Sequence, residues 1–200
     1  MMRVKLLAIL AGMIATLAVS AVPASAEFQS NSTKATGMGH SGAAVLEGGG
    51  ATLECTSTQG KWTILSATGQ EQAKGVQLKL NITTWNGCTA KTSLVKGVAA
   101  KVKECALDLE QAAGESKAKG STVTECTVEV KVLGTCIIST PGQQHNLETN
   151  LLTNVGQNLE VKAEDSGIVT EPKGSGCIGI SKTTNAKEKA IFTVEGAQWS

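Results

Sequence analysis

The clearest pattern of hydrophobic and polar positions lies in residues 122–140, which read TVTECTVEVKVLGTCIIST. Charged and hydroxyl residues alternate there with an apolar parity that consists of Cys126, Val128, Val130 and Val132. A period of two places that parity on one face of a β-strand and the other parity in water. After Gly134 a second β-prone run carries Cys136. We therefore predict two half-buried strands, each of which carries a cysteine.

The same alternation recurs along the rest of the chain. Residues 76–85 form its cleanest example, with one apolar parity made of Val76, Leu78, Leu80 and Ile82. Further strands are expected at residues 51–57, 61–67, 147–152, 159–163, 178–181 and 190–194. Turn signals such as Asn86-Gly87 and Pro141-Gly142 separate these runs. Many short alternating strands with turns between them predict an all-β domain, either an antiparallel β-sandwich or an open barrel, held by disulfides.

Three segments give a weaker pattern. Residues 27–50 are rich in Gly, Ser, Thr and Ala, so we expect a flexible segment with an edge strand near Phe28, followed by the β-domain in residues 51–200. Residues 98–113 fit both a helical stripe and a strand alternation, and the strands expected on either side favour the strand. Residues 114–120 are charged and flanked by glycines, which predicts a loop.

The N-terminal 26 residues have the organisation of a secretory signal peptide. Arg3 and Lys5 precede an apolar run over residues 6–22, and residues 24–26 form an A-x-A cleavage site. A retained membrane anchor is the alternative, because the run is about as long as the shortest bilayer span. The cleavage site directly behind the run favours removal. We therefore expect a mature chain that begins at Glu27, has no membrane span, and is secreted or held at the cell surface.

The six cysteines all lie behind the expected cleavage site, and their even number predicts up to three disulfides in an exported chain. Their spacing contains no C-x-x-C pair and brings no histidine close, so neither a metal site nor a cofactor is predicted. Spacing alone leaves the connectivity open. Pairing in sequence order gives the candidates Cys55–Cys88, Cys105–Cys126 and Cys136–Cys177. The middle pair would lie opposite one another if residues 103–110 and 122–132 form a hairpin.

The composition limits which residues can build the core and which classes of partner are expected. The chain has no tyrosine, two phenylalanines and three tryptophans, so Val, Ile, Leu and Ala must build most of the core, and cross-links gain importance. Trp62, Trp85 and Trp199 are expected to pack in it. Cleavage would remove Arg3, the only arginine, and the lysines are scattered. Nucleic-acid binding is therefore not expected, because guanidinium forks and clustered positive charge are missing.

Catalytic chemistry finds little support in the sequence. His40 lies in a glycine-rich tract and His145 in a polar turn, and no G-x-S-x-G motif positions a serine. The carboxylates of the predicted strands fall mostly on the solvent parity, as do Glu54, Asp108, Glu129 and Glu160. We predict no catalytic residue.

The order of features from Glu54-Cys55 through residues 86–88 to residues 175–177 resembles a family of secreted Thr/Gly-rich β-proteins of soil actinobacteria related to Solirubrobacter and Conexibacter. The shared plan is a signal peptide, a strand that ends in Cys, a Gly-Cys pair, further cysteine-bearing strands and a terminal hairpin. The resemblance implies export and a β fold, and it supplies neither an activity nor site residues. The lack of tyrosine and the lysine- and glutamate-rich residues 96–119 depart from the family pattern.

These observations favour a secreted or cell-surface protein that is not an enzyme and has a structural or binding role. Cell-wall material, extracellular protein and glycan are the partner classes that export makes accessible. The alternative is a small extracellular hydrolase or hydrolase inhibitor whose site is carried on loops.

Overall fold

A computed structural model describes residues 27–65, 67–68, 74–103, 105–111, 117–122, 126–131, 134–142 and 149–200. The expected signal peptide, residues 1–26, lies outside these residues. All the regular secondary structure in them is β, and the paired strands are antiparallel. The prediction of an all-β antiparallel fold is therefore confirmed.

The alternation of side chains produces most of the expected burial, although Val76, which was expected to point inward, precedes β6 and is 48% exposed. In β6 (Gln77–Asn86) Leu78, Leu80 and Ile82 point inward and are at most 6% exposed. In β11 (Cys126–Lys131) Val128 and Val130 are buried in the same way. Residues 98–113, which were ambiguous, contain the strands β8 (Val98–Val102) and β9 (Cys105–Gln111), so the strand interpretation is confirmed for the part that the structure describes.

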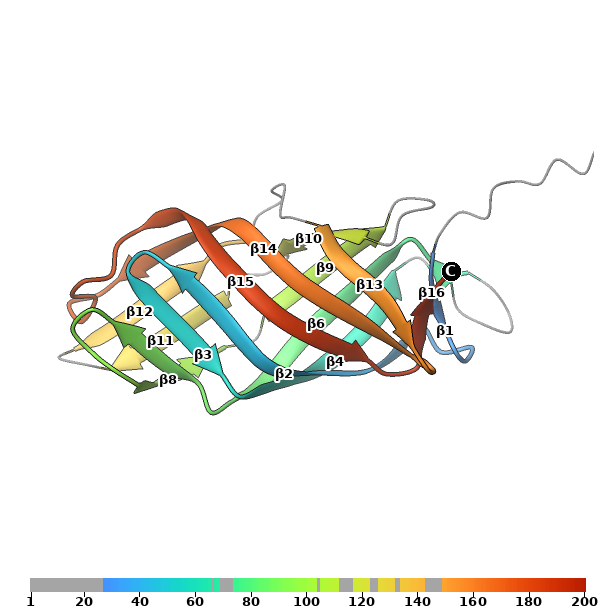
Figure 1. Ribbon diagram of the computed structural model, residues 1–200, viewed down its shortest axis with the longest axis horizontal. Helices are drawn as coiled ribbons and strands as arrows, with labels where there is room; N and C mark the ends of the chain where they lie inside the picture. Colours follow the sequence, from blue (N-terminus) through green and yellow to red (C-terminus); the bar gives the residue numbers. More distant parts are fainter. Residues whose placement is uncertain are drawn as a thin grey trace, which may run out of the picture.

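Three long strands run side by side along the middle of the molecule (Figure 1). They are β2 (Thr36–Gly48), β14 (Asn158–Lys173) and β15 (Thr183–Val194). β15 lies between the other two and pairs with both. Because these strands are long, their two ends can pair with different neighbours, and two closed rings form around them.

The first ring continues from β14 through β13 (Thr149–Val155), β10 (Lys117–Thr122), β9, β6 and β4 (Ser57–Leu65), which pairs back to β2. The second ring continues from β2 through β3 (Ala51–Cys55), β7 (Thr89–Thr92), β8, β11 and β12 (Thr135–Thr140), which pairs with β14. Each ring contains eight strands, of which β2, β14 and β15 are common to both. Closure leaves few exposed strand edges, which are otherwise sites of unwanted pairing.

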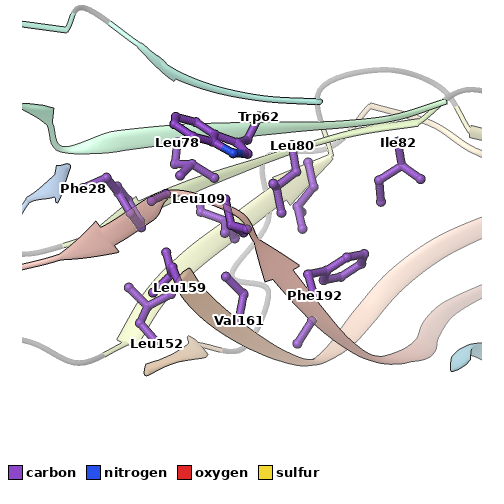
Figure 2. Packing of buried hydrophobic residues seen from close by; sticks show 14 of the residues in the cluster. Phe28, Trp62, Leu78, Leu80, Ile82, Leu109, Leu152, Leu159, Val161 and Phe192 are labelled. Carbon is purple, nitrogen blue, oxygen red and sulfur yellow. The ribbon is translucent and has the colours of Figure 1, made fainter. Parts of the chain in front are cut away.

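Each ring encloses its own apolar core. In the first ring, side chains from β4 and β6 face those from β13, β14 and β15, with Trp62 and Phe192 as the large members (Figure 2). The second core contains Leu53, Val130 and Ile138. The core of the first ring also includes Phe28, which belongs to a small separate sheet in the order β16 (Ala197–Trp199), β1 (Phe28–Ser30), β5 (Lys74–Gly75).

The register shifts in the shared strands lie where these strands pass from one ring to the other. Between β2 and β15 the register shifts after Ala190, so the buried residue of β2 changes from Ser41 to Ala44. Between β14 and β15 it shifts after Asp165, at Gly167, whose φ is +74°. A β-bulge bends a strand and turns its side chains to the other face. These bulges allow the same strands to present inward residues to both rings.

The closed rings differ from the sandwich or open barrel expected from the sequence. Closure depends on the pairings β2–β4 and β12–β14, which join residues far apart in the chain. A strand pattern shows which residues point inward, and it does not show which strands become neighbours. The bulges also interrupt the alternation within β2 and β14, so neither strand is visible as one long run.

The structure differs most from the sequence-based expectation in residues 27–50. A strand does begin at Phe28, but β1 lies in the middle of its small sheet. Residues 36–48, expected to be flexible, form β2, one of the strands common to both rings. Gly37 serves packing there, because a Cβ at that position would lie 2.5 Å from Nε1 of Trp62. A side chain at that position would displace the indole from the core.

Three smaller expectations are also corrected. Residues 178–181 do not form a strand: 178–179 form a turn after Cys177, in which the Ile180 amide donates to the Cys177 carbonyl at 3.3 Å. Residues 117–120 belong to β10, while 112–116 lie outside the described residues. The expected hairpin of residues 103–110 with 122–132 is absent from the described residues, because β9 pairs with β10 and β6, whereas β11 pairs with β8 and β12.

The six cysteines form three disulfides, Cys55–Cys88, Cys105–Cys126 and Cys136–Cys177. These are the pairs in sequence order. The first and third lie in the core of the second ring. The second joins the start of β9 in the first ring to the start of β11 in the second, two strands that do not pair with each other.

Candidate functional site

A cavity of about 70 Å³ lies between the two rings. The first ring contributes Ile82, Ala106 and Leu107 to its wall, and the second contributes Leu53, Val102 and Val128. The shared strands complete it with Ala44, Val45, Leu46, Ile168 and Glu188. The disulfide Cys105–Cys126 also lines it and ties the two sides together. The wall is therefore almost wholly apolar, with a fixed covalent link across it.

One acidic side chain, Glu188, lines this apolar cavity. Its Cα is paired with that of Asp165 on the neighbouring strand β14. Both residues share the inward parity of their strands: Ala186 and Ala190 are buried on either side of Glu188, and Ala163 is buried two residues before Asp165. Asp165 is only 2% exposed. Two carboxyl groups thus lie side by side on the inner face, next to the bulge at Gly167.

Burial and, as a smaller contribution, the negative charge of Asp165 together raise the pKa of the Glu188 carboxyl to about 7. The Glu188 side chain is partly buried, and it lines the cavity. A carboxyl with this pKa exists in both protonation states near neutral pH. It can therefore donate a hydrogen bond when protonated and accept one, or pair with a cation, when ionised.

Two further residues with polar groups line the cavity. Thr140, at the end of β12, is buried and carries a hydroxyl group. Trp85, near the end of β6, packs against the cores of both rings. Its Nε1–H is buried and finds no acceptor among the described residues. A buried donor without an acceptor costs free energy, which an acceptor atom of a bound molecule or a water would recover.

The residues that the sequence singled out lie elsewhere. His40 is exposed on β2, with Nδ1 3.2 Å from the Glu195 carboxylate, and His145 lies outside the described residues. Glu54 forms a surface ion pair with Lys91 at 2.5 Å. Neither His40 nor Glu54 lines the cavity.

Asp108 and the tryptophans were also assigned to water or to the core from the sequence. Asp108 was expected in water, yet its Oδ1 is buried, and burial raises the pKa of the carboxyl although Lys79 opposes the shift. The tryptophans pack as expected: Trp62 is 1% exposed, and Trp85 and Trp199 are partly buried against the first core.

Glu188 and Asp165 were not among the predicted site residues, although the sequence carries a signal for their inward position. The strand expected at residues 190–194 has its inward residues at even positions, and extending that parity backwards reaches Glu188. Likewise, extending the inward parity of residues 159–163 reaches Asp165. The expected strands at residues 159–163 and 190–194 stopped short of both carboxyl residues, whereas β14 and β15 include them.

Neither family models, nor curated proteins, nor solved structures match this chain. In the part of the chain that the structure describes, there is no helix of the length and apolar character needed to cross a membrane. Over the same residues, no three His, Cys, Asp or Glu side chains gather in a way that could hold a metal ion.

Proposed function

We propose that this protein is an exported binding protein, without enzymatic activity, that takes a small and mostly apolar molecule into the cavity between its two rings. The observation that carries the proposal is the cavity itself: an apolar wall that contains one acidic group. Ligand sites generally combine an apolar lining with a few polar groups that orient the ligand. Barrels commonly hold such ligands in their interior.

The volume of the cavity limits the ligand. An engineered cavity of ~150 Å³ with a similar lining accepts benzene or xenon, and the cavity here, at about 70 Å³, is about half that size. It fits a short alkyl group or another group of a few heavy atoms. A larger ligand would have to leave part of itself outside.

Export is the second part of the proposal. The three disulfides are consistent with an extracellular location, because thiols stay reduced in most intracellular compartments. We propose that residues 1–26 act as a cleaved signal peptide and that the mature protein is secreted or held at the cell surface. Mass spectrometry of the exported protein should then find Glu27 at its N-terminus.

A small hydrolase is the second candidate, and the pair of carboxyl groups favours it. Adjacent carboxyls with a raised pKa occur in acid–base catalysis. The case is weaker here, because the described residues that line the cavity include no histidine, serine or lysine beside Glu188. Turnover of ester, peptide or glycoside substrates that disappears in Glu188→Gln would favour this candidate over the binding protein.

Binding in the cavity can be tested with xenon and n-butanol as probes. Each probe is titrated into the isotope-labelled protein, and chemical shifts of the methyl groups of Leu53 and Val128 are followed by NMR. Val102→Phe should fill the cavity and weaken binding at least tenfold. Lys101→Phe adds the same ring to the adjacent, exposed position of β8 and should bind like wild type.

Shifts confined to the surface, or equal binding by both phenylalanine variants, would rule out the cavity as the binding site. Thermal unfolding of both variants establishes that each is folded before binding is compared.

A further inference from the structure

We infer that the ligand of this cavity carries a protonated amine, which pairs with the Glu188 carboxylate while the apolar part of the ligand packs against the wall. The inference rests on the proposed function and assigns a chemical class to the ligand. Its basis is the charge distribution around the cavity. Glu188 and Asp165 lie side by side on the inner face, whereas Lys187 and Lys189 of β15 and Lys162 of β14 are exposed.

The charged groups around Glu188 can be followed strand by strand. On β15 itself, Lys187 and Lys189 flank Glu188 in sequence, but both are exposed and belong to the opposite parity. On β14, Asp165 faces inward, while Lys162 and Glu164 point outward and pair with each other at 3.1 Å.

On the other side of β15, strand β2 places Leu46 opposite Glu188, and the next residue, Glu47, is exposed. Among the described residues that line the cavity, Glu188 is the only ionisable one, since Cys105 and Cys126 are joined in a disulfide. Among the described lining residues there is therefore no cation to balance its negative charge. A positively charged ligand would supply one.

The geometry of the wall distinguishes an amine from other ligands. An anion would be repelled by both carboxyls. A bare metal ion would need more oxygen ligands than one carboxylate and the Thr140 hydroxyl provide. An ammonium group is compact and has three donors, which the Glu188 carboxylate and the Thr140 hydroxyl can accept. A hydroxyl or ether oxygen on the same ligand would be the acceptor that the Nε1–H of Trp85 lacks.

Such binding depends on pH through Glu188. The amine pairs with the ionised carboxylate, whereas burial and Asp165 hold the pKa of the empty site at about 7. Protonation of Glu188 therefore competes with the ligand below that pH. The affinity should fall about tenfold for each pH unit, or about 100-fold between pH 8 and pH 5.

The test compares n-butylamine with n-butanol, which has the same chain and no charge at these pH values. Dissociation constants are measured by NMR titration at pH 8 and pH 5 for wild type, Glu188→Gln and Glu47→Gln. Wild type should bind the amine at least tenfold more tightly than the alcohol at pH 8 and lose most of that preference at pH 5. Glu188→Gln should bind the two equally, and Glu47→Gln should match wild type.

The outcomes separate this inference from the proposed function. If wild type binds the alcohol as tightly as the amine, or if Glu188→Gln keeps the preference for the amine, the inference is wrong and the cavity still binds. If neither probe shifts the cavity methyl groups, the cavity is not a ligand site, and the proposed function fails with the inference. Retention of n-butanol binding by Glu188→Gln shows that this variant still forms the cavity.

Discussion

Replacing Glu188 with glutamine should change how the stability of the protein depends on pH. The substitution preserves the size of the side chain and removes its ability to ionise. Burial, with the added charge of Asp165, raises the pKa of Glu188 from 4.5 to about 7 in the folded protein. A pKa unit corresponds to about 1.4 kcal/mol, so the shift is worth about 3 kcal/mol in the free energy of unfolding.

The sign follows from which state binds the proton more tightly. Between pH 4.5 and pH 7 the folded wild type keeps the proton on Glu188, whereas the unfolded chain releases it. Raising the pH through this range therefore favours the unfolded chain, and the stabilising effect of the protonated group is lost by pH 7. Glu188→Gln has no such proton, so this contribution to the pH dependence disappears.

Urea unfolding followed by circular dichroism at pH 4, 5, 6, 7 and 8 measures the effect. The free energy of unfolding of Glu188→Gln, minus that of wild type, should rise by about 3 kcal/mol between pH 4 and pH 8, with most of the change from pH 4.5 to 7. Glu47→Gln, which removes an exposed carboxyl on β2, serves as the control and should show little change. A difference for Glu188→Gln that does not vary with pH would refute the buried, charge-repelled state of this carboxyl.

Three further predictions concern the fold, each measured as the free energy of unfolding in urea. Gly37→Ala should lose about 1–3 kcal/mol, because its Cβ would meet a buried indole, whereas Gly42→Ala, with open space around the new Cβ, should stay within about 0.5 kcal/mol of wild type. Leu159→Ala should lose about 2–5 kcal/mol, because the side chain is fully buried, and a smaller loss would place it outside the core. Replacing Cys136 and Cys177 together with alanine should cost about 4 kcal/mol, because their disulfide closes a loop over a sequence separation of 41, and an unchanged stability would contradict that role.

The local features of the fold were predictable from the sequence because they depend on neighbouring residues. The inward set of Leu78, Leu80 and Ile82 follows directly from a period of two. The strand nature of residues 105–111 was also accessible, since the strands expected on either side favoured a strand over the helical stripe. These are statements about which face a side chain occupies, and composition and order determine that face within a few residues.

The closure of the rings was not accessible in the same way. It depends on contacts such as that of Thr36 with Thr63, or Ile138 with Pro172, between strands that the pattern cannot pair. The glycines of β2 were misleading for a related reason. Gly37 leaves room for the Trp62 indole of β4. The reason for a glycine at this position is therefore apparent only once β2 and β4 are known to be neighbours.

Predicting the candidate site would have required both the inward parity of each strand and the pairing between strands. The parity of β15 could have placed Glu188 inside, but nothing local indicates that Asp165 would become its partner across β14. The two carboxyls come together through pairing in the folded sheet, and the cavity that they border exists only where the two rings meet. Residue type and spacing alone therefore indicated no site.

The three strands that both rings share have a consequence for how this protein can be divided. Neither half can be excised as an independent unit, because a fragment that retains one set of flanking strands must also retain the whole of β2, β14 and β15, and these would then expose half their length. Unfolding of one ring should therefore unfold the other ring as well, in a single cooperative transition. Insertions and fusion points are better tolerated at the outer turns, such as the one at Gly156 between β13 and β14, than anywhere along the shared wall.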